Sequence, residues 1–209
     1  MVDLKGIKNI IFDFGGVIIN IDFNLSINAF KKLGFLKIEE VIFKPDNSRL
    51  LLMMERGQMT TEEFYTEIRK SSGLSLSDKE IEIAWNALLL DIPEKRIRLL
   101  EKLRNNYRIF LLSNSNVIHY KKYMTGLYNK YGYSGFDKLF EKAWFSHDLK
   151  MNKPNQDIFN YSLNDARLIP EETLFIDDTK INTDAASKTG MKVYYLKTGE
   201  EISELLGGN

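Results

Sequence analysis

The sequence predicts an α/β protein, a three-layer α/β/α arrangement with a Rossmann-like parallel sheet. Five short apolar runs rich in β-branched and aromatic residues are expected as buried strands: residues 7–14, 107–112, 143–145, 173–176 and 193–196. Helical patterns lie between the later runs, and in residues 93–105 the side chains of Ile97, Leu100 and Leu103 share one face. Strands that alternate with helices of this length are typical of a parallel sheet covered on both faces.

A helical part interrupts this alternation after the first strand. From about residue 23 to residue 90 the apolar spacing is helical throughout. Two sets are expected to share a helix face, namely Phe23, Ile27 and Phe30, and Ile81, Ala84, Trp85 and Leu88. Helix starts are marked by capping boxes, which run from Thr60 to Glu63 and from Ser77 to Glu80.

We therefore expect two domains, an α/β core of residues 1–19 and 92–209 and a helical cap of residues 20–91. Open α/β sheets bind ligands beyond the carboxyl ends of their strands, and an insertion after the first strand lies over that edge. The cap is expected to act as a lid.

Composition narrows the partners. The chain has 209 residues, 44% of them hydrophobic, with 29 Lys and Arg against 29 Asp and Glu and no cysteine. Balanced charge without basic blocks argues against nucleic acid and membrane surfaces and favours a small ligand. Without cysteine there is no disulfide framework, and no apolar run is long enough for a membrane span, so we expect a cytoplasmic protein. The sequence does not predict its oligomeric state.

Polar side chains are placed where predicted strands end. Asp13 lies at the carboxyl end of the first strand and is followed by Gly15. Ser113 and Asn114 follow the second strand and Asp177 and Asp178 follow the fourth, with Lys153 between these two groups in the chain. Because the carboxyl ends of parallel strands meet at one edge of a sheet, these side chains are expected to converge.

In order and spacing, Asp13, Ser113, Lys153 and the pair Asp177 and Asp178 resemble the four motifs of the haloacid dehalogenase-like hydrolase superfamily. The resemblance spans the chain and implies the strand order 5-4-1-2-3. Within the superfamily, residues 12–17, 21–24, 55–57 and 146–149 are most similar to the bacterial α-D-glucose-1-phosphatase group.

The resemblance implies a Mg²⁺-dependent phosphatase of small phosphorylated metabolites, with a sugar phosphate expected. Asp13 would be the nucleophile and form an aspartyl-phosphate, Lys153 would neutralise phosphate charge, and Ser113 would bind a phosphoryl oxygen. The implied Mg²⁺ ligands are Asp13, the Gly15 carbonyl and Asp178, with Asp177 as a second ligand or an orienting neighbour. The expected substrate-binding residues are Asn114, Asp22 and Arg56.

One departure concerns Gly15, because phosphatases of this superfamily usually carry an acid/base Asp two residues after the nucleophile. Asp22 is a candidate substitute, and the alternative is that Asp22 caps the helix that begins near Phe23. Lys150 stands where relatives often have Gly. Glu55 and Arg56 either reach the substrate or are solvated charges.

Three other functions stay open. A dehalogenase also lacks the second Asp, but the adjacent Asp177 and Asp178 would repel each other in a site without a metal. The second is a module that binds phosphate or Mg²⁺ without turnover. The third is a mutase-like transferase.

The remaining candidates have structural interpretations. For His119 and His147 we expect roles at the surface or behind the reacting groups. The tyrosines from Tyr120 to Tyr133 are expected in helix packing or a subunit contact.

Overall fold

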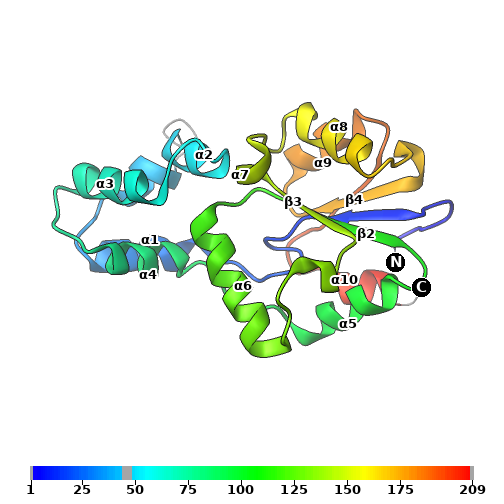
Figure 1. Ribbon diagram of the computed structural model, residues 1–209, viewed down its shortest axis with the longest axis horizontal. Coiled ribbons are helices and arrows are strands. Elements are labelled where there is room, and N and C mark those ends of the chain that lie inside the picture. Colours follow the sequence, from blue (N-terminus) through cyan, green and yellow to red (C-terminus); the bar gives the residue numbers. More distant parts are fainter. Residues whose placement is uncertain (1, 44–48, 208–209) are drawn as a thin grey trace.

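The sheet has five parallel strands in the order β3-β2-β1-β4-β5 (Figure 1). We describe residues 2–43 and 49–207 of a computed structural model. The strands are β1 (Asn9–Phe12), β2 (Arg108–Ser113), β3 (Lys142–Phe145), β4 (Thr173–Asp177) and β5 (Lys192–Tyr195). The order and the parallel pairing confirm the predicted fold class and strand order.

Helices cover the sheet on both faces (Figure 1). One face carries α5 (Glu94–Leu103), α6 (Val117–Tyr131), the 3₁₀ turn η3 (Phe136–Lys138) and α10 (Ile202–Leu206). The other carries α8 (Gln156–Asp165) and α9 (Lys180–Ser187). Two short elements, α7 (Ser146–Leu149) and η4 (Pro170–Glu172), lie in the connections.

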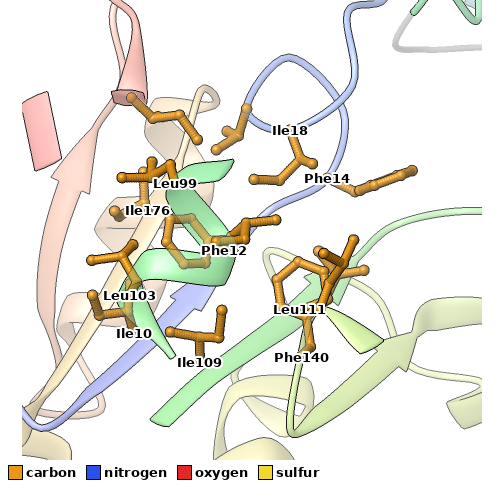
Figure 2. Packing of buried hydrophobic residues seen from close by; sticks show 14 of the residues in the cluster. Ile10, Phe12, Phe14, Ile18, Leu99, Leu103, Ile109, Leu111, Phe140 and Ile176 are labelled. Atoms are coloured by element: carbon orange, nitrogen blue, oxygen red, sulfur yellow. The ribbon is translucent and has the colours of Figure 1, made fainter. Parts of the chain in front are cut away.

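Alternation along β1 divides the core into two layers. Ile10 and Phe12 pack with residues of α5, including Leu103 (Figure 2). Ile11 points to the other face and packs with residues of α8 and α9, including Phe159. All four residues of β1 are buried, as expected for the central strand of a parallel sheet. The central strand therefore holds the residue that follows it, Asp13, on a rigid support.

Between β1 and α5 the chain forms what we call the insert helices. They are α1 (Phe23–Lys32), the π-helical turn η1 (Glu39–Phe43), α2 (Arg49–Glu55), α3 (Thr61–Ser72) and α4 (Asp78–Asn86). Their own apolar cluster includes the fully buried Phe30, Phe64 and Trp85. Both predicted capping boxes are confirmed, at Thr60 and at Ser77.

One prediction on the insert helices is wrong. Phe23 does not lie on the buried face with Ile27 and Phe30, because 49% of its surface is exposed. It is the first residue of α1, and its side chain lines a cavity, whereas Ile27 and Phe30 belong to the apolar cluster of the insert helices.

The insert helices leave and rejoin the core as two paired segments, which we call the neck. Asn20 N–H donates to Asp91 O at 2.9 Å, Leu90 N–H donates to Asn20 O at 3.0 Å, and Asp22 N–H donates to Leu88 O at 2.9 Å. Across residues 2–43 and 49–207, none of the helices has the length and apolar character that a bilayer crossing requires.

Candidate active site

Three carboxylates meet at the carboxyl edge of the sheet. Asp13 directly follows β1, Asp177 ends β4, and Asp178 is the next residue. Since β1 and β4 are neighbours with Phe12 opposite Ile176, the three side chains reach the same place. One oxygen of each lies within 4.8 Å of the others. The structure thus brings together carboxylates that are 164 residues apart in the chain.

The ammonium group of Lys153 lies between two of these carboxylates. Lys153 Nζ is 2.7 Å from Asp13 Oδ1 and 2.7 Å from Asp177 Oδ2, and the side chain is 1% exposed. Its Nζ also lies over the Phe175 ring, 5.4 Å from the centroid. Burial alone would disfavour the ammonium, but the charges of Asp13 and Asp177 outweigh it and raise the pKa of Lys153. Lys153 is therefore a fixed cation at this edge.

Asp177 is saturated with hydrogen bonds. Its Oδ1 accepts from Thr179 N at 2.8 Å and from Asn182 Nδ2 at 3.1 Å, and its Oδ2 accepts from Asn182 and from Lys153. Asn182, in α9, was missed by the sequence reasoning because an amide one turn into a helix has no distinguishing pattern. With all its acceptor sites facing protein donors, Asp177 is suited to orienting Lys153.

Asp178 lies against the backbone turn that follows β1. Gly16 has φ +72°, and a Cβ added there would overlap with the Asp178 carboxylate. Glycine at position 16 is needed on both counts, for the left-handed backbone and for the close approach. Besides a long contact from Thr179 Oγ1 at 3.4 Å, the Asp178 carboxylate keeps acceptor sites available.

The charge balance of the cluster fits a divalent cation. Three carboxylates face one ammonium, and this excess of negative charge is disfavoured in a buried place. Burial raises the pKa of Asp13 against the opposing charge of Lys153, and Asp177 adds to the rise. Burial and Asp177 likewise raise the pKa of Asp178. Hard oxygen donors at this spacing are the ligand type that Mg²⁺ prefers, so the residues present fit that ion.

Ser113 and Asn114 complete the edge at the end of β2. Asn114 Oδ1 accepts from Lys153 N at 2.9 Å, and Asn114 Nδ2 donates to Lys153 O at 2.9 Å. Ser113 is 3% exposed and neighbours this contact. In the loop before Lys153, Lys150 has φ +56°, which explains why a residue without a side chain would be easier to place there.

A cavity of about 120 Å³ opens beside this cluster. Gly15, Ser113 and Asn114 line it from the core, and the insert helices contribute mainly apolar side chains such as Leu51 and Trp85. Glu55, at the end of α2, is the acidic side chain in its lining. Burial raises the pKa of Glu55 to about 7, although the charges of Lys153 and Arg56 oppose the rise.

Of the two places expected for His119, the structure excludes the surface. It is not at the surface but buried in the lining of the cavity, with its ring stacked on Trp85 at 4.9 Å and Nδ1 at 2.9 Å from Asn86 Oδ1. Burial lowers the pKa of His119 to about 3, so the ring is neutral. His147 lies behind the reacting edge, with Nδ1 at 3.2 Å from Ser115 O. In the tyrosine-rich stretch, Tyr123 is buried, as helix packing requires, whereas Tyr128 is 62% exposed.

Two predicted substrate-binding residues make structural contacts. Asp22 caps α1 by accepting from Asn24 N at 2.9 Å, as its alternative interpretation expected, and it is not among the residues that line the cavity. Arg56 Nε donates to Asn152 Oδ1 at 2.8 Å. That bond ties the end of α2 to the residue before Lys153. Substrate binding by Asp22 and Arg56 stays a prediction.

The chain is similar to known proteins over most of its length. The chain is 29% identical over 195 residues to a D-ribitol-5-phosphate phosphatase of Bacteroides thetaiotaomicron. The match covers 93% of this chain and 94% of that relative. Among solved structures, it is 43% identical, with a TM-score of 0.87, to a HAD family enzyme of Bacteroides thetaiotaomicron in complex with magnesium and inorganic phosphate; the match covers 95% of this chain and 98% of that one. A HAD-like hydrolase from Porphyromonas gingivalis, at 36% identity and a TM-score of 0.86, covers 96% and 98% respectively. Because the haloacid dehalogenase-like hydrolase model matches residues 10–196, most of the chain, this protein belongs to the haloacid dehalogenase-like hydrolase family.

Proposed function

We propose that this protein is a Mg²⁺-dependent phosphoric monoester hydrolase that acts on small sugar or polyol phosphates through an aspartyl-phosphate on Asp13. The observation that carries the proposal is the convergence of three carboxylates and the buried ammonium of Lys153 at one sheet edge. The family, and relatives that include a ribitol-phosphate phosphatase and a magnesium and phosphate complex, support it.

Each side chain has a distinct part in the transfer. The Asp13 carboxylate attacks phosphorus, and Lys153 holds that carboxylate and neutralises charge on the phosphoryl oxygens. The Ser113 hydroxyl donates to a phosphoryl oxygen. Asp177 keeps Lys153 in place through their 2.7 Å contact.

Asp13, Asp178 and the Gly15 carbonyl would hold Mg²⁺. The ion supplies positive charge that lets an anionic carboxylate approach an anionic phosphate. The saturated hydrogen bonds of Asp177 favour an orienting role for it over direct ligation.

The insert helices, as part of a cap of residues 20–91, would close over this edge. The apolar cavity that they share with Gly15 and Ser113 would hold the leaving group and restrict water during transfer. The narrower resemblance to α-D-glucose-1-phosphatases stays a prediction, and glucose 1-phosphate and ribitol 5-phosphate are both candidate substrates.

A panel of phosphomonoesters, assayed with Mg²⁺ and with chelator, tests the proposal. We expect phosphate release that requires Mg²⁺ and is lost in Asp13→Asn. Phosphate or Mg²⁺ binding without turnover would indicate the non-catalytic module instead. Halide release from haloacids in chelator would indicate the dehalogenase, and isomerisation of a sugar phosphate the transferase.

A further inference from the structure

The reaction requires a proton donor for the leaving group, and the position two residues after Asp13 does not supply one. An alkoxide is a poor leaving group, so cleavage of an alkyl phosphate needs an acid at the leaving oxygen and then a base for the attacking water. Gly15 offers no side chain for this, and the alternative carboxylate, Asp22, is bonded to the start of α1. Another titratable group of the same cavity has to be considered.

Three titratable side chains line that cavity: Glu55, His119 and Tyr123. His119 is a neutral ring held by Asn86 and Trp85, and has no proton to give as an acid of ordinary strength. Tyr123 is engaged with Ser115 Oγ at 2.8 Å, and burial raises the pKa of its hydroxyl further. Of these three side chains, Glu55 is the remaining candidate for the proton donor.

We propose that Glu55 is the catalytic acid and base of the reaction, facing the leaving group from the insert helices. The inference rests on the proposed phosphatase function. Among residues 2–43 and 49–207, no hydrogen bond or ion pair engages the Glu55 carboxyl group. It lines the same cavity as Gly15, Ser113 and Asn114 and is free to bond to a ligand there.

Glu55 is held in place by its neighbours rather than by its own side chain. The next residue, Arg56, is bonded to Asn152 at 2.8 Å. Gly57 has φ +57°, and a Cβ there would overlap with the His147 carbonyl. The backbone at Gly57 is therefore in close contact with the segment that leads to Lys153. These contacts place the end of α2 beside α7 (Figure 1).

The charged surroundings suit a group that changes protonation state during turnover. Lys153, from the core loop, and Arg56, on the same turn, favour the carboxylate, whereas burial favours the acid, and the pKa of Glu55 is raised to about 7. His119, from α6, adds no charge. An acid with a pKa near the working pH is suited to both directions of proton transfer.

The protons balance over the two steps. In the first, Asp13 forms a bond to phosphorus, the P–O bond to the leaving group breaks, and the Glu55 proton passes to the leaving oxygen, which departs as an alcohol. In the second, water attacks phosphorus, Glu55 carboxylate takes a water proton, and the aspartyl P–O bond breaks. Hydrogen phosphate leaves, Asp13 is a carboxylate again, and Glu55 is an acid again.

Glu55→Gln tests the inference with two leaving groups, and Glu62→Gln, exposed on α3, is the matched control. With the best alkyl phosphate of the panel, we expect Glu55→Gln to lose roughly 10²- to 10⁴-fold in kcat, because a positioned acid is missing. With p-nitrophenyl phosphate, whose leaving group needs no proton, we expect a burst of nitrophenolate followed by slow turnover. The burst would arise because only hydrolysis of the aspartyl-phosphate then lacks its base.

The outcomes separate the two proposals. If the parent protein has no Mg²⁺-dependent phosphatase activity, the proposed function fails. If the parent is active and Glu55→Gln matches it on both substrates, or loses equally on both without a burst, the function stands and the acid/base role of Glu55 is overturned.

Thermal unfolding of Glu55→Gln should match the parent, since the carboxyl group has no hydrogen bond to lose. If Glu55→Gln is unstable, the pH–rate profiles of the parent and of Glu55→Asp decide. An ionisation near pH 7 in the parent that is displaced in Glu55→Asp would support the role, and identical profiles would contradict it.

Discussion

The side chain of Asn114 bonds to both polar groups of the Lys153 backbone, accepting from its N–H and donating to its carbonyl at 2.9 Å each. These two residues are 39 positions apart, and the pair of bonds fixes the loop that presents the ammonium group to Asp13. Asn114 therefore supports the reacting edge through Lys153, whatever further contact it makes with substrate.

Asn114→Ala should lower kcat and stability together. Losing two partly buried hydrogen bonds leaves the Lys153 backbone groups unpaired, which costs about 2 kcal/mol, and lets Nζ move from its place between the carboxylates. We expect kcat to fall by about 100-fold, because a displacement of about 1 Å is enough for such a loss. Steady-state kinetics and urea unfolding measure the two effects, with the exposed Asn164→Ala as control. Wild-type kcat in Asn114→Ala would contradict the supporting role.

Gly16→Ala should weaken Mg²⁺ binding, and Gly6→Ala provides the matched control. Both glycines have positive φ, +72° and +77°, so both variants bear a similar backbone cost of about 1 kcal/mol. Only at position 16 does the added methyl meet Asp178; at Gly6 nothing lies within 4 Å. Mg²⁺ titration of activity should show at least ~10-fold weaker apparent affinity in Gly16→Ala, as expected for a displaced ligand. Equal titrations in the two variants would refute the contact.

Lys153→Met should destabilise the fold as well as abolish activity. The substitution leaves the Asp13 and Asp177 carboxylates buried without their ammonium partner, which costs about 3 kcal/mol. Mg²⁺ should restore part of this stability, because it binds the folded state only. Unfolding midpoints with and without Mg²⁺ measure both effects, and Lys180→Met, exposed on α9, is the control. If Lys153→Met is as stable as Lys180→Met in chelator, the Lys153 ammonium does not stabilise the buried carboxylates of Asp13 and Asp177.

The ion pair between Arg96 and Glu201 should make stability fall in acid. Burial opposes ionisation of Glu201, but hydrogen bonds from Arg96 and Ser203 outweigh it and lower its pKa from 4.5 to about 2. A lowered pKa gives stability that is complete above 4.5 and is lost as the pH falls toward 2. Glu201→Gln should therefore be less stable than the parent by about 2 kcal/mol at neutral pH. This deficit should shrink toward zero in strong acid.

Urea unfolding across that pH range measures the deficit. Glu94→Gln, which breaks the exposed pair with Arg98, is the control and should change stability less at every pH. A deficit of Glu201→Gln that is the same at all pH values would mean that the Glu201 charge is not responsible.

Sequence patterns predicted the sheet and the converging edge because both follow from local rules. Buried parallel strands are short apolar runs, and residues that follow them share an edge, so Asp13, Ser113 and Asp177 could be placed together. Side-chain surroundings could not be predicted in the same way. His119 was expected at the surface or behind the reacting groups, and the choice between these two places depends on Trp85 and Asn86, which are 34 and 33 residues away in the chain.

The position of Glu55 shows the same limit. Its sequence neighbours are compatible with a solvated charge, whereas the bond between Arg56 and Asn152, across 96 residues, and the approach of Gly57 to His147 hold this end of α2 against the core. Gly16 is a contrast, because a positive φ restricts the residue type locally and favours glycine. Lys150 also has a positive φ, but it drew attention only through the resemblance to the family.

The neck has a consequence for how this chain can be altered. Because Asn20 and Leu90 are bonded to each other, the polypeptide leaves and returns at almost one point, separated by the spacing of two paired strands, about 5 Å. A replacement module has to meet that separation and also to reproduce the contacts that Trp85 makes with His119 and Arg56 makes with Asn152. A transplant designed for new selectivity therefore has to carry the matching core residues with it.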